Sequence, residues 1–301
     1  MCIRDRLDRE STFKDAEIVS LLKSRFIPVA IDQAYQRRQK DTEGDFYRKI
    51  AGQGPRNNFK STTQGLYLAT AAGKLLGYNN NRGGDRIRRM MKKALAGFEA
   101  PAAAVIKRSK VDARYNPKPP EGGLVVRVQT KVLGGYEETE DRWQKIFQNA
   151  LSRDNLWVTK EEQDALAAGR VPAALQKRIA RYHLVDNTRG EPPMWKADEI
   201  RSIEFSLKGG RLSGSVHLET ASGERGYKAS LLGHVETKKG RITRFDLVAR
   251  GEYWGEGTYT RGAPKGRFPL AASFTLADGS DIADGVPPQG SRGWVRGYLR
   301  Q

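Results

Sequence analysis

The sequence predicts an α/β domain followed by a β-rich antiparallel domain with a helical insert. Three observations predict this arrangement. Amphipathic helical stretches alternate with short β-branched runs over 7–112, a stretch rich in proline and glycine occupies 113–123, and short strands separated by glycine turns fill most of 124–301. A length of 301 residues fits two domains of ordinary size.

The first domain is expected to begin with a helix, a buried strand and a second helix. Ser11 or Thr12 can cap the first helix, whose apolar residues recur at helical spacing over 18–22. Phe26–Asp32 is short, apolar and rich in β-branched residues, which is typical of a buried strand. The polar segment 34–52 is compatible with a helix.

A hairpin and a third helix are expected to complete this domain. Leu66–Ala69 and Leu75–Tyr78 have strand composition and are separated by a glycine turn. Asp85 is positioned to cap the last helix. The strand–helix–strand order implies that Phe26–Asp32 and Leu66–Ala69 form a parallel pair. Residues 113–123 are then the linker to the second domain.

The second domain, 124–301, is expected to be an antiparallel barrel or sandwich. Residues 124–128 form its first strand, and helices fill an insert at about 140–185, one of them opened by a capping box at Thr159–Glu162. Five further strands are predicted at 200–207, 212–219, 226–235, 242–249 and 268–276. Glycine turns at 208–210 and 222–224 favour hairpins between neighbouring strands.

The first domain resembles the thioredoxin-like fold family over residues 7–100, about a third of the chain. The resemblance is carried by Thr12–Ile18 (Thr-Phe-Lys-Asp-Ala-Glu-Ile), by Arg25–Asp32 and by the turn Ala71–Leu75. Met1–Arg6 resembles a translated sequencing-adaptor remnant, so we exclude it from the fold. The resemblance implies a thioredoxin-like domain that has lost its first strand, with the native start of the protein missing.

The residues that carry redox chemistry in this family are not present in the chain. The resemblance places the two redox cysteines at positions 2 and 5, which are Cys2 and Asp5 and lie inside the excluded segment. It places a cis-proline at Thr63–Gly65, where there is none. The chain has a single cysteine, so it can form no internal disulfide and no cysteine-based zinc site.

The net charge of +18 is uneven and makes polyanions a candidate partner. Residues 1–120 hold 25 basic and 12 acidic residues, and residues 121–301 hold 28 and 23. A basic face attracts nucleic acid and anionic glycans. The candidate polyanion-binding residues are Arg82, Arg86, Arg89, Lys92 and Lys93. The alternative is a solvated helix face.

Two segments of the second domain gather residues suited to chemistry or ligand binding. His183, Asp186, Arg189 and Glu191 share one loop and could serve acid–base chemistry or hold an anion. Glu252, Trp254, Glu256 and Arg261 could bind a sugar or a cation. The alternatives are a solvated connection and a tryptophan that packs one end of the barrel. We expect neither metal nor cofactor, because His183, His217 and His234 form no close-spaced ligand set.

The function expected from these observations is a redox-inactive thioredoxin-fold module joined to a β-rich domain that binds a protein or small-molecule ligand. One alternative is a thiol–disulfide oxidoreductase whose cysteine pair was lost with the native start. A second is a polyanion- or nucleic-acid-binding protein, and a third is a hydrolase centred on 183–191 or 252–261. The printed chain is expected to have no enzymatic activity and no membrane-spanning segment. The resemblance implies an exported or cell-envelope setting.

Overall fold

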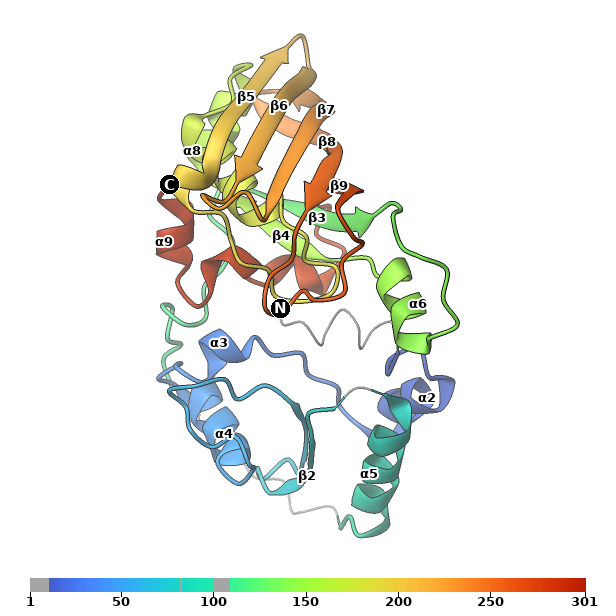
Figure 1. Ribbon diagram of the computed structural model, residues 1–301. Coiled ribbons are helices and arrows are strands. Elements are labelled where there is room, and N and C mark those ends of the chain that lie inside the picture. Colours follow the sequence, from blue (N-terminus) through green and yellow to red (C-terminus); the bar gives the residue numbers. More distant parts are fainter. Residues whose placement is uncertain (1–10, 82, 100–108) are drawn as a thin grey trace. The chain divides into compact units, whose positions relative to one another are not determined.

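The computed structural model describes residues 11–81, 83–99 and 109–301 (Figure 1). They separate into two compact units. The N-terminal unit comprises the described residues up to Pro117 and, from the far end of the chain, Arg292–Trp294. The C-terminal unit comprises Lys118–Ser291 and Val295–Gln301. The division falls inside the expected linker 113–123. In the described part of the chain, every helix is too short or too polar to cross a bilayer.

The N-terminal unit is a small α/β structure with a two-stranded antiparallel sheet. Its elements are α2 (Ala16–Arg25), α3 (Gln33–Gln36), α4 (Thr42–Ala51), β1 (Leu66–Ala69), β2 (Leu75–Asn79) and α5 (Gly84–Ala96). A core of Ile18, Leu68, Ile87, Met91 and Ala94 joins α2, β1 and α5. The predicted hairpin is therefore confirmed. A hairpin alone is marginal in water, so this one depends on the helices packed against it.

The helix caps differ from those expected. Asp15 rather than Ser11 or Thr12 caps α2, because its carboxylate accepts the backbone N–H groups of Glu17 and Ile18 at 3.1 Å. Asp85 lies in the first turn of α5, after a cap at Gly83 that makes no side-chain hydrogen bond. An acidic residue is favourable in a first turn even when it is not the cap.

The predicted strand at Phe26–Asp32 is wrong. The backbone is extended at both ends of this segment, but the segment belongs to no strand. Ile27 is 92% exposed and Val29 is 71% exposed. An extended segment becomes a strand only when a neighbour pairs with its backbone, and no described strand lies beside it. The expected parallel pair with Leu66–Ala69 is accordingly absent from the described residues.

The C-terminal unit is built on one curled, seven-stranded antiparallel sheet that forms a half-barrel. Its strands are β3 (Leu124–Val132), β4 (Asp154–Val158), β5 (Ile200–Lys208), β6 (Arg211–Glu219), β7 (Gly226–Lys238), β8 (Arg241–Trp254) and β9 (Arg267–Leu276). Their order in the sheet is β4-β3-β9-β8-β7-β6-β5 (Figure 1). Strands β5 to β9 form a meander, and β9 then pairs with β3.

The predicted strands of this unit are confirmed within a few residues, but the expected closed barrel or sandwich is not found. A single open sheet takes its place. Strand β4 was missed, because its five residues lie between two helical patterns. All five are buried in the sheet, so the insert at 140–185 is only partly helical. The capping box at Thr159 and Glu162 is present as predicted.

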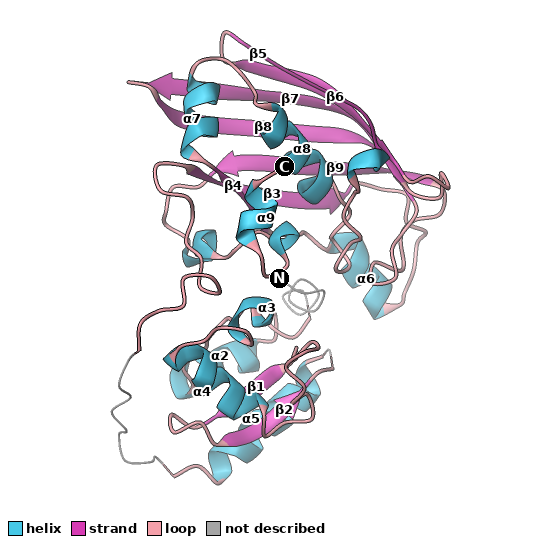
Figure 2. Ribbon diagram, turned by 90° about the vertical axis from the view of Figure 1, so that its left-hand side faces the viewer, coloured by secondary structure: helices cyan, strands magenta, loops and turns pink. Residues whose placement is uncertain are grey.

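Helices from the insert and from the C-terminus cover one face of the curled sheet (Figure 2). The short elements of this unit are α6 (Arg142–Asn149), α7 (Lys160–Ala167), α8 (Ala173–Arg178), the π-helix η1 (Ile179–His183), the 3₁₀ helices η2 (Ala197–Glu199), η3 (Ile282–Gly285) and η4 (Gln289–Ser291), and α9 (Val295–Leu299). The covered face carries the core. Alternate residues of each strand point into it, among them Tyr227, Tyr253 and Phe268.

A fully buried arginine joins the insert to the C-terminal helix. The guanidinium of Arg178 forms a two-pronged ion pair with Glu162, with both N–O distances at 2.7 Å. It also donates to the backbone carbonyls of Trp157, Tyr298 and Leu299 at 2.8–3.1 Å. One side chain therefore holds β4, α7, α8 and α9 together. A buried charge is tolerated only with such complete pairing.

Removing one partner of this clamp is expected to destabilise the C-terminal unit strongly. Glu162→Ala would leave the Arg178 charge buried and uncompensated, at a cost of about 3–5 kcal/mol. Asp164→Ala is the matched control, because it removes an exposed pair with Lys160 in the same helix and should cost about 0.5 kcal/mol or less. Urea denaturation followed by tryptophan fluorescence measures both. Equal losses in the two variants would contradict the clamp.

Candidate functional site

A groove of about 630 Å³ opens at one end of the curled sheet, where β3 and β8 begin and β9 ends. Its lining is mostly apolar and includes a few polar groups. The apolar lining residues are Leu124, Val125, Ile242, Leu276 and Ala277, and the polar ones are Arg241, Thr243, Asp281 and Asp284. The groove is open to solvent rather than enclosed, and a cleft of this volume with few polar groups is within the size range of small-molecule sites.

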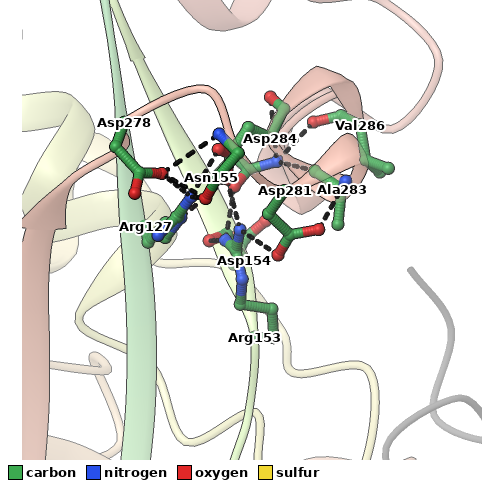
Figure 3. Close-up of polar contacts among 10 residues, drawn as sticks. Arg127, Arg153, Asp154, Asn155, Asp278, Asp281, Ala283, Asp284 and Val286 are labelled. Carbon is green, nitrogen blue, oxygen red and sulfur yellow. Dashed lines mark hydrogen bonds and ion pairs between the residues drawn. The ribbon is translucent and has the colours of Figure 1, made fainter.

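One wall of the groove is the loop after β9, which is held by charged side chains (Figure 3). Arg127 of β3 donates to both carboxylate oxygens of Asp284, at 2.9 and 2.8 Å, and to Asp278 at 2.5 Å. Asp284 is in turn bound by the nearly buried Arg153, at 2.7 Å. Arg127 of β3 and Arg153, the residue immediately before β4, thus converge on a single buried carboxylate.

Asn155 of β4 fixes the backbone of the same loop. Its side-chain amide donates to the carbonyls of Ala283 and Val286, at 2.7 and 2.8 Å. Asp281 caps the short helix η3 by accepting the backbone N–H of Ala283 at 2.8 Å. The wall is therefore a preformed part of the structure (Figure 3), because its carboxylates and carbonyls are tied to β3 and β4.

This fixed wall presents an exposed apolar side chain. Ile282 is 97% exposed and lines the groove. It lies between Asp281 and Asp284, whose polar contacts hold the loop. A single exposed isoleucine is ordinary on a protein surface. Ile282 differs from such a residue because it lies beside the apolar lining of the groove, where it could contact a bound molecule.

Arg127 and Arg153 lower the pKa values of carboxyl groups in the wall. The hydrogen bonds from Arg127 are the largest cause that holds the pKa of Asp284 below its ordinary value, with the nearby charge of Arg153 adding to it. The pKa of Asp278 is also lowered, by its hydrogen bonds with Ser280 and with Arg127. Both carboxylates are therefore charged at neutral pH, and both are already compensated by arginine.

The loop at 183–191 is buried, contrary to the solvated connection considered above. Arg189 pairs with Asp186, donates to the hydroxyl of Tyr136 at 2.8 Å and donates to the carbonyl of Thr260 at 3.1 Å. The second oxygen of Asp186 accepts the hydroxyl of Thr188 at 2.7 Å. This network holds the loop in the core. Glu191, at its end, is half-buried.

His183 belongs to a different buried chain of polar groups. Its Nε2 lies 2.7 Å from the hydroxyl of Tyr298, and its Nδ1 lies 3.2 Å from a carboxylate oxygen of Asp154. Burial raises the pKa of Tyr298 well above its ordinary value. All three side chains are shut off from solvent. This Asp–His–Tyr chain has the composition of a catalytic relay, but its position makes it a link between α9 and the sheet.

The residues predicted at 252–261 do not form one site. Glu252 is exposed and lies 3.7 Å from Arg267. Trp254 is buried, donates its indole N–H to the carbonyl of Gly223, and has its ring covered by the guanidinium of Arg267 at 3.9 Å. Its face is therefore unavailable for stacking on a sugar.

Glu256 and Arg261 are the other two predicted residues of this segment, and both are exposed. Glu256 accepts the backbone N–H groups of Gly262 and Ala263 at 2.9 and 3.2 Å, so it shapes its own loop. The two predicted loops do meet, through Arg189 and the carbonyl of Thr260, but they meet inside the core. Among the described residues, no cluster of His, Cys, Asp and Glu side chains could hold a metal ion.

The basic stripe of the N-terminal unit is partly neutralised. Lys92 pairs with Glu17 at 2.6 Å. Arg82 lies outside the described residues. Arg86, Arg89 and Lys93 are exposed on α5. Among the described residues, the positively charged face of α5 therefore has fewer unpaired cations than the five residues predicted from the sequence. Polyanion binding stays a prediction.

Sequence reasoning missed the residues of the groove. Asp278, Asp281 and Asp284 recur every third residue after the last strand, and this spacing was the available signal. Their partners Arg127, in β3, and Arg153, immediately before β4, are more than a hundred residues away along the chain, and only the order of strands in the sheet brings them together. Nothing local in the sequence pairs them.

The paired wall is expected to make stability depend on pH through Asp284. Its folded pKa lies below the unfolded value of about 3.9, so its contribution is complete above that value and is lost as pH falls through the folded pKa. Wild type should therefore exceed Asp284→Asn in melting temperature at neutral pH, with the difference shrinking below about pH 4. Asp246→Asn, at an exposed pair with Arg244, is the control. A difference that does not change with pH would contradict the assignment.

Comparisons with family models, with curated proteins and with solved structures gave no match to this chain. The candidate site therefore rests on its own geometry, namely the groove beside the Arg127–Asp284 network.

Proposed function

We propose that the C-terminal half-barrel is a ligand-binding domain and that the groove beside Arg127 and Asp284 is its site. The observation that carries the proposal is Ile282, an apolar side chain that is held in solvent by a rigid, charge-paired loop at the edge of an apolar groove. Covering an isoleucine side chain contributes about 1.5–3 kcal/mol. A preformed wall lowers the entropy cost of binding.

Binding is favoured over catalysis by the state of the titratable groups. The carboxylates of Asp284 and Asp281 at the groove are engaged by arginine and by backbone N–H groups. The groups with catalytic composition, His183 and Asp154, lie in the core behind α9. A general acid or base must reach the proton that it transfers. The groove supplies shape and apolar surface, which suit recognition of a small molecule.

We also propose that the N-terminal unit is a thioredoxin-like module without redox chemistry in this chain. What supports it is the order of elements: helix α2, an extended segment, helices α3 and α4, a hairpin and helix α5. The turn of the hairpin, within the segment Ala71–Leu75 that carries the resemblance, has Gly73 at a positive φ. The exposed, extended segment Phe26–Asp32 departs from that pattern.

The groove is tested by titration with 1-octanol, a neutral aliphatic probe, followed by methyl NMR. Saturable shifts are expected for the methyl groups of Leu276 and Ile242, which line the groove. Ile282→Asp should weaken binding several-fold, since it removes apolar contact area. Ile27→Asp, which changes an equally exposed isoleucine in the other unit, should leave it unchanged. Shifts that do not saturate, or that Ile27→Asp abolishes, would refute the groove as the site.

Redox inactivity is tested by reduction of insulin in the presence of dithiothreitol. A dithiol mechanism needs two cysteines and the chain has one, so the rate should equal that of dithiothreitol alone. Cys2→Ser should not change it. A rate above background that Cys2→Ser removes would show that the single thiol is active and would overturn this part of the proposal.

A further inference from the structure

The groove has one strongly charged group that nothing in the described chain neutralises. Arg241, the first residue of β8, lines the groove and is exposed. Among the described residues it takes part in no ion pair. By contrast, the two carboxylates at the groove are already occupied, Asp284 by Arg127 and Arg153, and Asp281 by the N–H of Ala283.

The surroundings of Arg241 add to its positive charge. It follows the tight turn Lys238-Lys239-Gly240 between β7 and β8, and it is directly opposite Lys238 in the sheet. The nearest carboxylate along β7, Glu236, is shared by Arg244 at 3.0 Å and His234 at 3.4 Å. Arg241 therefore lines the groove with two lysines beside it in the sheet and the turn, while the nearest carboxylate of β7 is engaged elsewhere.

The apolar part of the groove is lined by residues of β3, β8 and β9. Ile242 follows Arg241 in β8, and Leu276 and Leu124 continue the lining across β9 and β3. Ile282, on the loop after β9, also lines the groove and is exposed. A ligand that satisfies both parts has an anion at one end and a hydrocarbon body. A cation at a groove rim selects anionic groups by charge-assisted hydrogen bonding.

We propose that the groove takes an aliphatic molecule with a single anionic headgroup, with the headgroup on Arg241 and the chain over Ile242 and Leu276 towards Ile282. This inference rests on the proposed ligand-binding function and specifies its ligand class. Because Arg241 is exposed, the headgroup contact is screened by salt, whereas the contact with the chain is not.

The test uses three probes that share an eight-carbon chain, namely octanoate, 1-octanol and octylammonium, titrated into the full chain at low salt. Octanoate is expected to bind about tenfold more tightly than 1-octanol, and octylammonium more weakly than either. Arg241→Gln should lower octanoate affinity to that of 1-octanol and leave 1-octanol unchanged. Arg250→Gln removes an exposed arginine from the same strand, away from the groove, and should change neither.

The outcomes separate this inference from the function on which it rests. Saturable 1-octanol binding with no preference for octanoate would overturn the headgroup assignment and leave the groove as a site. Loss of 1-octanol affinity in Arg241→Gln would mean that the arginine shapes the groove, which also overturns the assignment. Absence of binding by all three probes would refute the ligand-binding function itself. An octanoate preference that disappears at high salt and in Arg241→Gln supports the inference.

Discussion

The C-terminal unit depends on one buried guanidinium, that of Arg178, whose N–H groups all need hydrogen-bond acceptors. Arg178 lies in the core, where each of its N–H groups must find an oxygen because no water is available to supply one. Glu162 supplies two oxygens, and carbonyls from β4 and α9 supply the others. Only an arrangement that brings these separate segments together satisfies the group, so packing of the helices on the sheet and pairing of the charge are inseparable.

The same device recurs at two other buried arginines. Arg189 fixes the loop at 183–190 by reaching Asp186, Tyr136 and Thr260. Arg153 fixes the loop after β9 through Asp284. In each case a buried guanidinium holds irregular backbone through several acceptors, because a buried charge needs complete pairing. Arginine and aspartate residues, which suggest an active site when read in the sequence, therefore hold the core loops of this unit together.

The groove differs from these core loops in being open to solvent. The hydrogen bonds of Arg127, Arg153 and Asn155 hold its wall in place. Its lining is mostly apolar and open to solvent. Rigid, accessible and apolar surface is the combination that binds small molecules without reorganisation. The N-terminal unit shows the opposite state at Phe26–Asp32, where apolar side chains are exposed on a segment that no described strand pairs with.

Local patterns in the sequence determined where most helices and strands form. The tertiary structure decided how these elements pair and which side chains they bury. Alternation of apolar residues predicted β5 to β9, and Thr159 with Glu162 predicted the start of α7, because these signals act within a few residues. At Phe26–Asp32 composition favoured a strand, but a strand needs a neighbour, which composition cannot supply. Whether His183 and Arg189 are exposed, and whether Asp284 meets Arg127, depended on the order of strands in the sheet. Pairing between groups more than a hundred residues apart has no local signature, so only the folded chain shows where the groove lies.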